Sequence, residues 1–375
     1  MKPHALWSHS LPERVAMLQG GTTRVAYLAP KPEYGTFRYR CFNAVDALNS
    51  HSSKFSASFF FYSDLDVVEN LADHADILVV SRCPHDGPLD RVYRRFRNKG
   101  KAVLFDIDDL VFDTRFATLV ASNLGYVLEE EELNQWTAFI SNVGTALRAS
   151  DGVITSTKYL GGLIQDFTNN PVYVSSNTFN SAQRDVSEKV RRIEQSSPGL
   201  RLGYFSGSHS HSLDFAIIKS QLAAFLRESP SSTLTIAGHL ALPPEFSEFG
   251  ERITTLPFMD FLDIQKALAA IDLNLVPLQD GPFTWSKSEL KYFEAALVRT
   301  PTLASATPVF REAITQGRNG YLATSTEWLS TLRTIASRGH EELASVGAQA
   351  QHHAVTAYSP ESLALRLEKI LNKHN

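Results

Sequence analysis

The sequence predicts an α/β protein built from two doubly wound parallel sheets. Short apolar runs alternate with helical patterns along the chain, which is the order expected of parallel strands joined by crossover helices. The chain has 375 residues, more than a single hydrophobic core usually supports. Its hydrophobic fraction of 43% is sufficient to fill two packed cores, so two domains are expected.

The N-terminal half contains six apolar runs that we expect to form strands. Polar and turn-forming segments separate these runs, so each can end in a loop before the next helix. Ligands of such sheets bind beyond the carboxyl ends of the strands, and the residues that follow each run are therefore candidates for function. The expected strands are 24–29, 55–61, 77–81, 102–105, 152–155 and 171–174.

Breaks in these patterns predict the domain boundaries. A hinge is expected at 177–184, followed by a charged helical piece and a break at 196–199. The end of the chain has helical periodicity with a proline in the first turn. The predicted division is an extension over 1–22, a first domain over 23–180, a linker over 181–200, a second domain over 201–357 and a final helix over 358–375.

The segment 271–305 carries the strongest functional signal in the chain. It reads as a strand over 271–278, a polar loop over 279–285, a helical pattern, and a second strand over 302–305. A helix start offers unpaired backbone N–H groups and the positive end of the helix dipole, which together favour a diphosphate. This segment therefore predicts an anion site at the start of its helix.

The side chains at that helix start fit the same chemistry. Ser286 or Ser288 is expected to cap the helix. Lys287 and Lys291 are four residues apart, so both ammonium groups can reach one anion from the same helical face. Glu294 follows, and its carboxylate can accept hydrogen bonds from two vicinal hydroxyls such as those of ribose. The segment therefore predicts a sugar-nucleotide site.

These residues resemble the GT-B glycosyltransferases, in particular family 4, the glycosyl transferases group 1. In that family a glutamate precedes an apolar run, a proline and an apolar strand, and residues 294–305 are similar to this element. Many members also carry a lysine three residues before the glutamate, which Lys291 matches. A second family glutamate, eight positions earlier, corresponds to Ser286, so Glu289 is the alternative source of its role near the donor sugar.

Four more segments resemble the same family in the same order. Residues 202–215 resemble the first strand of the C-terminal domain with its phosphate-approaching loop, and 233–238 resemble the second strand. Residues 253–260 resemble the strand and loop that frame the base, and 317–322 resemble the closing turn. The resemblance implies the GT-B fold, in which two Rossmann-like domains face a cleft and a C-terminal helix crosses back to the N-terminal domain.

The resemblance also implies a donor site for a nucleotide diphosphate sugar on the C-terminal domain. Its implied activity is hexosyl transfer to a glycan or other hydroxyl acceptor in polysaccharide or glycoconjugate synthesis, with retention and without a metal or other cofactor. The expected catalytic residues are Lys291, Lys287, Glu289 and Asp108. The expected donor contacts are Ser206, Gly207, Ser208, His209, His211, Pro257, Phe258, Met259, Phe283, Ser286, Ser288 and Glu294.

Loops after the first, third and fourth strands are expected to contact the acceptor. Arginines after a glycine turn suit an anion or acceptor contact, although they could equally pair with local carboxylates. The aspartates after the fourth strand could orient acceptor hydroxyls, and one of them could instead cap the next helix. The expected acceptor-side residues are Gly35, Arg38, Arg40, Arg82, His85, Asp106 and Asp109.

Two other functions stay open on the sequence. Asp106 and Asp108 follow an apolar run and also resemble the nucleophile motif of haloacid-dehalogenase-type phosphatases, in which the first aspartate attacks phosphorus and the second acts as acid/base with Mg²⁺. That motif usually lies on the first strand of its domain, whereas three expected strands precede it here. The serine in place of the second family glutamate also allows a non-catalytic sugar-nucleotide binder.

Composition limits the partners and the compartment. The net charge of -4 gives no general basic field, so nucleic acid is not an expected partner. Cys41 and Cys83 lie in or beside apolar runs, which is typical of buried free thiols in a reducing compartment. The sequence shows no signal-peptide or transmembrane pattern, and we expect a cytoplasmic protein. A lipid-linked glycan acceptor would add a peripheral association with the inner face of the membrane.

Overall fold

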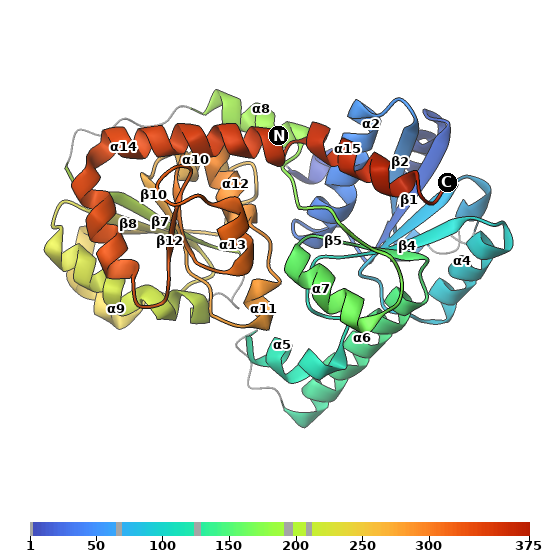
Figure 1. Cartoon of the computed structure of the whole chain (residues 1–375), viewed down its shortest axis with the longest axis horizontal. Helices are drawn as coiled ribbons and strands as arrows, with labels where there is room; N and C mark the ends of the chain where they lie inside the picture. Colours follow the sequence, from blue (N-terminus) through green and yellow to red (C-terminus); the bar gives the residue numbers. More distant parts are fainter. Residues whose placement is uncertain (1–2, 65–69, 124–128, 191–197, 208–211) are drawn as a thin grey trace.

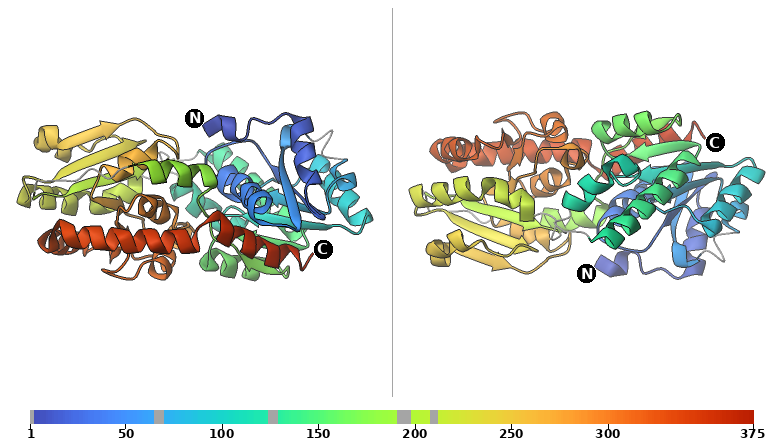
Figure 2. Two further views of the ribbon diagram at one scale, coloured as in Figure 1. Left: turned by 90° about the horizontal axis from the view of Figure 1, so that it is seen from above. Right: turned by 90° about the horizontal axis from the view of Figure 1, so that it is seen from below.

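A computed structural model of the chain describes all residues except 1–2, 65–69, 124–128, 191–197 and 208–211. The described part contains two six-stranded parallel sheets, each with helices packed around it (Figure 1). The two sheets lie in separate domains that sit side by side, and α8 (Ser181–Lys189) lies between them (Figure 2). The predicted α/β class with two doubly wound domains is confirmed.

The N-terminal sheet has the strand order β2-β1-β3-β4-β5-β6. The order reverses between β1 and β3, and doubly wound sheets bind ligands beside such a reversal. Its strands are β1 (Thr23–Ala29), β2 (Phe55–Phe61), β3 (Ile77–Ser81), β4 (Ala102–Ile107), β5 (Gly152–Thr155) and β6 (Val172–Val174). Its helices are α2 (Asn43–His51), α4 (Gly87–Asn98), α5 (Ala117–Asn123), α6 (Glu130–Arg148) and α7 (Lys158–Phe167), with a π-helical turn, η3 (Arg38–Phe42), before α2. Short 3-10 turns lie at η4 (Tyr62–Asp64), η5 (Leu71–Asp73) and η6 (Thr114–Phe116).

The C-terminal sheet has the strand order β12-β11-β10-β7-β8-β9, which reverses between β7 and β10. Its strands are β7 (Arg201–Ser206), β8 (Thr233–Gly238), β9 (Ile253–Leu256), β10 (Leu273–Val276), β11 (Thr302–Ser305) and β12 (Tyr321–Ala323). Its helices are α9 (Ser212–Glu228), α10 (Ile264–Ala269), α11 (Pro282–Trp285), α12 (Leu290–Leu297) and α13 (Pro308–Ala313), with a helical segment η8 (Pro244–Arg252) before β9. Buried apolar clusters pack against this sheet as they do against the first.

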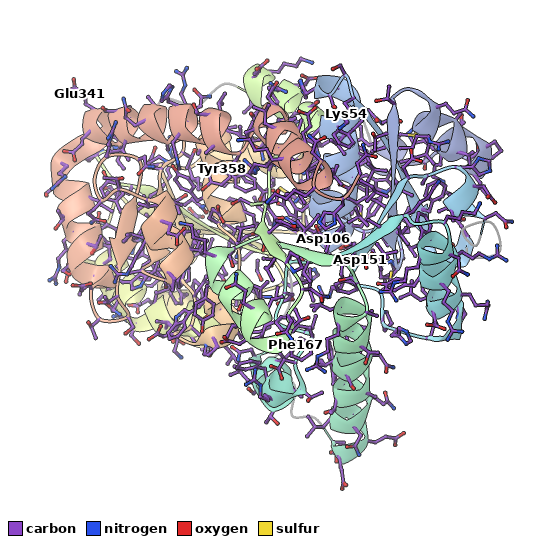
Figure 3. All side chains as sticks on the ribbon, turned by 45° about the vertical axis from the view of Figure 1, so that its right-hand side comes forward. Lys54, Asp106, Asp151, Phe167, Glu341 and Tyr358 are labelled. Atoms are coloured by element: carbon purple, nitrogen blue, oxygen red, sulfur yellow. The ribbon has the colours of Figure 1, made fainter. Side chains whose placement is uncertain are left out.

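The last two helices confirm the expected crossing. Helix α14 (Trp328–Ala357) runs along the C-terminal domain and bends at Gly339, whose φ is 81°. Helix α15 (Pro360–Leu371) then packs against α2 of the N-terminal domain (Figure 1). Apolar side chains of α15, from Leu363 to Leu371, belong to a core cluster of the N-terminal domain. Tyr358 lies at the junction of the two helices (Figure 3).

The first residues are more ordered than the predicted irregular extension. They contain three short helical segments, η1 (Pro3–Leu6), α1 (Leu11–Ala16) and η2 (Met17–Gln19). Trp7 is 4% exposed, and its ring packs on Tyr34 of the N-terminal domain and on Phe261 of the C-terminal domain. Burying such a large aromatic ring stabilises the segment against the body of the protein. The extension therefore contributes to the contact between the domains.

Gly238 at the end of β8 allows a close approach to β7. Its φ of 93° is disfavoured for residues with a Cβ, and an added Cβ would lie 2.0 Å from the carbonyl oxygen of Ser206. We expect Gly238→Ala to lower the free energy of unfolding by more than about 2 kcal/mol, because both the strain and the clash must be relieved. Urea unfolding measures this change.

Gly250→Ala is the matched control for Gly238→Ala. Gly250 lies in the same domain with a φ of 52°, and no heavy atom lies within 4 Å of its added Cβ. It should cost only the backbone strain, about 1 to 3 kcal/mol, and less than Gly238→Ala. Equal losses in the two variants would mean that the contact with Ser206 has no energetic weight.

Candidate active site

A cavity of about 400 Å³ lies between the two domains. The N-terminal domain lines it with the loop after β1 and the loop after β4, and the C-terminal domain lines it with the end of β8 and the loops after β7, β9 and β10. In each sheet these loops include one that follows a strand at the point where the strand order reverses, β1 in the first sheet and β7 and β10 in the second, where doubly wound sheets bind their ligands. The predicted edge of each sheet therefore faces the same enclosed space.

The helix entry after β10 differs from the prediction. Gly281 and Pro282 begin a separate one-turn helix, α11, and α12 begins only at Leu290. Ser286 is the C-cap residue of α11 rather than a cap of α12, and its hydroxyl donates to the carbonyl of Pro282 at 2.7 Å. The expected cap at Ser286 or Ser288 and the shared helical face of the two lysines are therefore wrong, because proline at the first helical turn starts a helix early.

Lys287 nevertheless faces the cavity, from the connection between α11 and α12. Its Nζ lies 2.8 Å from Asp109 Oδ1 of the N-terminal domain and 4.1 Å from the centre of the Phe283 ring. The guanidinium of Arg82 lies 3.7 Å from the same carboxylate. Burial acts to raise the pKa of Asp109, but Lys287 and Arg82 outweigh it and hold that pKa below its usual value. The pair is thus ionised and bridges the two domains.

Lys291 reaches the cavity from the first turn of α12. Its Nζ lies 5.6 Å from the centre of the Tyr204 ring. Burial lowers the pKa of this ammonium, while the carboxylates of Asp214 and Glu294 act in the opposite direction. A cation removed from water in this way interacts strongly with any anion that enters the cavity.

Glu294 lines the cavity with a side chain that is held from outside its own domain. Its Oε1 accepts hydrogen bonds from Tyr39 Oη at 2.6 Å, Arg38 Nη2 at 3.2 Å and Gln183 Nε2 at 3.2 Å. The residue is only 6% exposed. Its position fits the predicted role as an acceptor for hydroxyl groups.

Glu289 turns away from this cavity. It lines a second cavity of about 160 Å³, also between the domains, with Ser156 of the N-terminal domain and Tyr358. Burial raises the pKa of Glu289 to about 6, against the lowering effects of Tyr358 and Arg366. Its Oε2 is buried and has no hydrogen-bond partner among the described residues. The role of Glu289 near a donor sugar stays a prediction that this geometry does not favour.

The other expected donor contacts divide into three groups. Ser206, Gly207, Phe258, Met259, Phe283 and Ser288 line the main cavity. Pro257 and Ser286 do not, and Ser286 is fully buried. Ser208, His209 and His211 lie outside the described residues.

The acceptor-side residues also separate. Gly35, Arg38, Asp108 and Asp109 line the main cavity, where Asp108 accepts a hydrogen bond from Thr36 at 3.1 Å. Arg40 and Asp106 do not line it, because both are buried in a bidentate ion pair with distances of 2.7 and 2.9 Å. Arg82 lies behind Asp109, and His85 lies 3.8 Å from Asp90 on α4, away from the cavity.

The three neighbouring aspartates bind three different partners. Asp106 binds Arg40, Asp108 binds Thr36 and Asp109 binds Lys287. Within the described ranges no group of three or more histidine, cysteine, aspartate or glutamate side chains is arranged to hold a metal ion. A phosphatase nucleophile must be open to its substrate, whereas Asp106 is 2% exposed with both oxygens on Arg40.

Sequence reasoning missed several residues that line the cavity. Tyr39 lies between two arginines that were selected, and Asp214 lies in a segment that was recognised for its strand and loop. Asp214 accepts a hydrogen bond from the backbone of Gln279 at 3.0 Å and so ties α9 to the loop after β10. The position of Tyr39 between two predicted site residues could have drawn attention to it. No sequence pattern, however, indicated which domain its side chain would face.

Residues 203–338 match the family described as glycosyl transferases group 1. The comparison with curated proteins gave no match. Solved structures with a similar fold include HepE from Anabaena in complex with UDP and glucose, at 14% identity and a TM-score of 0.62 over 93% of this chain and 99% of that one. Another is sucrose-phosphate synthase from Thermosynechococcus elongatus, at 11% identity and a TM-score of 0.60 over 93% and 98% of the two chains.

A third similar structure is a variant of TarM from S. aureus in complex with fondaparinux, alpha-GlcNAc-glycerol and UDP. It shares 16% identity with a TM-score of 0.54 over 83% of this chain and 58% of that one. These likenesses establish the fold and agree with the arrangement of the two sheets. None of the helices in the described ranges combines the length and apolar character that crossing a membrane requires.

The buried carboxyl of Glu289 should make stability depend on pH. Its folded pKa of about 6 lies above the ordinary value of 4.5, so the folded protein binds the proton more tightly than the unfolded chain. This contribution is fully present below the ordinary pKa and is lost as pH rises through about 6, by about 2 kcal/mol. We expect Glu289→Gln to remove that part of the pH dependence.

Urea unfolding between pH 4.5 and 7.5 measures the effect of Glu289→Gln. Glu312→Gln is the control, because this carboxylate lines the same second cavity but is half-exposed and pairs with Lys158. The Glu312→Gln control should keep the decrease in the free energy of unfolding with rising pH that the parent protein shows. A Glu289→Gln variant with the slope of the parent protein would contradict the prediction.

Proposed function

We propose that this protein, whose residues 203–338 match the group 1 family, is a GT-B glycosyltransferase that transfers a sugar from a nucleotide diphosphate sugar to a hydroxyl of a glycan acceptor. The observation that carries the proposal is the convergence of Lys287, Lys291 and Glu294 on one cavity between the domains. Two ammonium groups and a carboxylate in one space suit a diphosphate linked to a ribose. The complex of HepE with UDP-glucose supports a donor of this class.

The C-terminal domain would hold the donor. The diphosphate would meet Lys291, Lys287 and the backbone of Ser206 and Gly207, and the ribose would meet Glu294. Phe258 and Met259 are apolar residues that line the same cavity, and they are suited to contact the base. Negative charge that develops on the departing diphosphate is the main thing to stabilise, and preorganised cations do so without a metal. One such contact is worth on the order of 3 kcal/mol in the barrier.

The N-terminal domain would hold the acceptor. Asp108 faces the cavity beside Gly35, and its carboxylate can accept a hydrogen bond from an acceptor hydroxyl. We further propose retention of the anomeric configuration, with attack from the leaving-group face and the acceptor proton passing to the diphosphate. Enclosure between the domains would exclude water and limit hydrolysis of the donor. The glycan in the TarM complex supports an acceptor of this class.

The setting of the reaction belongs to the same proposal. The buried thiols of Cys41 and Cys83 favour a reducing, cytoplasmic setting. Synthesis of a polysaccharide or glycoconjugate would suit a glycan acceptor, and a lipid-linked acceptor would require peripheral contact with a membrane. A non-catalytic nucleotide-sugar binder is the second candidate, because serine stands at position 286 and Glu289 faces another cavity.

A panel of nucleoside diphosphates tests the donor site. We expect one of UDP, GDP, dTDP, ADP or CDP to raise the Tm selectively, and we expect this shift to persist in EDTA, because lysines rather than a metal hold the diphosphate. The Glu294→Ala variant should lose most of the shift. A shift that appears only with Mg²⁺ would contradict metal independence, and no shift with any nucleotide would contradict the donor site.

Lys291→Ala tests whether transfer takes place. We expect kcat to fall by a hundredfold or more, on the order of 3 kcal/mol, while the Kd of the nucleoside diphosphate changes less, because the charge matters most as the leaving group ionises. Transfer or slow donor hydrolysis, followed by release of nucleoside diphosphate, measures kcat. A loss confined to binding, with kcat unchanged, would refute this role. Absence of turnover in the parent protein with any acceptor would favour the non-catalytic binder.

A further inference from the structure

The carboxylate proposed to bind the donor ribose is oriented by residues that do not belong to the donor domain. Tyr39 is part of the turn η3 after β1 of the N-terminal domain, and Gln183 lies on α8 between the domains. Both donate to Glu294 Oε1, at 2.6 and 3.2 Å, and Arg38 donates to the same oxygen at 3.2 Å. The proposed donor site on the C-terminal domain is therefore completed by residues of the N-terminal domain and of α8.

The turn that carries Tyr39 is held firmly in place. Arg40, one residue later, is bidentate to Asp106 and also donates to the carbonyl of Ser175 at 2.7 Å and to Asn177 at 3.0 Å. A π-helical turn is rare, and such turns occur often at functional sites. Here it sends Tyr39 into the cleft and Arg40 into the body of the N-terminal domain.

Tyr39 itself packs inside the opposite domain. It is 5% exposed, belongs to a core cluster of the C-terminal domain and makes an edge contact with Phe293, next to Glu294. Burial raises the pKa of the Tyr39 phenol well above its usual value, so the hydroxyl remains a donor at any physiological pH. A short hydrogen bond from a neutral donor to a carboxylate is among the stronger ones in proteins.

These contacts leave the two oxygens of Glu294 in different states. Oε1 accepts hydrogen bonds from Tyr39, Arg38 and Gln183, which leaves this oxygen no free acceptor site for a further donor. Oε2 is then the oxygen left for hydroxyl groups of a ligand in the cavity. The carboxylate is held in one orientation, and this removes the entropic cost of ordering it when a ligand binds.

We propose that Tyr39 and Gln183 are positioning residues for Glu294, so that the donor ribose is recognised in full only when the two domains are closed on each other. This inference rests on the proposed function, in which Glu294 binds the ribose. Closure and ribose recognition are then linked, and each must favour the other by the same free energy. A nucleotide bound to the C-terminal domain would draw the N-terminal domain, and the acceptor residues on it, towards the donor.

The test compares a ribose ligand with one that lacks the ribose hydroxyls. The probes are UDP and its 2′,3′-dideoxy analogue, or the same pair for the base preferred in the nucleotide panel. Calorimetry gives both Kd values for the parent protein, Tyr39→Phe and Gln183→Met. We expect the parent protein to prefer the ribose form by at least tenfold and each variant to lose several-fold of that preference, with the Kd of the dideoxy form unchanged.

Tyr27→Phe is the matched control. Tyr27 is a fully buried tyrosine of β1 whose hydroxyl has no hydrogen-bond partner among the described residues. It should keep the full preference for the ribose form. In a Glu294→Ala background, Tyr39→Phe should have no further effect on this preference, because the side chain that it orients is gone.

The outcomes separate the inference from the function on which it rests. A parent protein that binds both forms equally, or neither, would refute the ribose role of Glu294 and the inference with it. A parent protein that prefers ribose, with Tyr39→Phe and Gln183→Met keeping the whole preference, would overturn the inference alone. Equal losses of affinity for both forms would also overturn it, because they would mean that the two side chains support the fold rather than the carboxylate.

Discussion

The ion pair between Arg40 and Asp106 is the contact on which the geometry of the cleft depends, because it joins three separate parts of the chain. It connects the turn after β1 to the end of β4, and through Ser175 and Asn177 it reaches the segment that leads out of the N-terminal domain. Burial acts to lower the pKa of Arg40, but Asp106 raises it above its usual value, so the guanidinium remains charged. Removing one partner of such a pair is strongly destabilising, on the order of 3 to 5 kcal/mol, because the other charge stays buried without compensation.

Electrostatics then determines what the cleft can bind. Burial lowers the pKa of the Lys291 ammonium, and the ammonium of Lys287 is shared with Asp109 from the opposite domain. An entering diphosphate would compete with Asp109 for Lys287, so the present ion pair and the proposed donor complex are alternatives at that position. The same ion pair joins the two domains across the cleft, and phosphate oxygens of a bound donor would replace its carboxylate.

The elements of the fold could be predicted because they follow from local patterns. The apolar runs 55–61 and 302–305 coincide with β2 and β11, and the final helical pattern matches α15. Buried parallel strands consist of continuous apolar residues, and this property is visible in the sequence. The sequence did not reveal that two helices, α11 and α12, stand where one was predicted. A one-turn helix started by Gly281 and Pro282 changes the helical register of the residues that follow.

The sequence by itself determined the chemical groups of the site, since Lys287, Lys291 and Glu294 follow one strand and must lie near its carboxyl end. Only the tertiary structure decided their partners. The hydrogen bond from Tyr39 to Glu294 joins residues 255 positions apart, and no local pattern encodes such a contact. Nor could the sequence reveal that Glu289, two residues after Lys287, faces a different cavity, because the direction of a loop side chain depends on the domain packed against it.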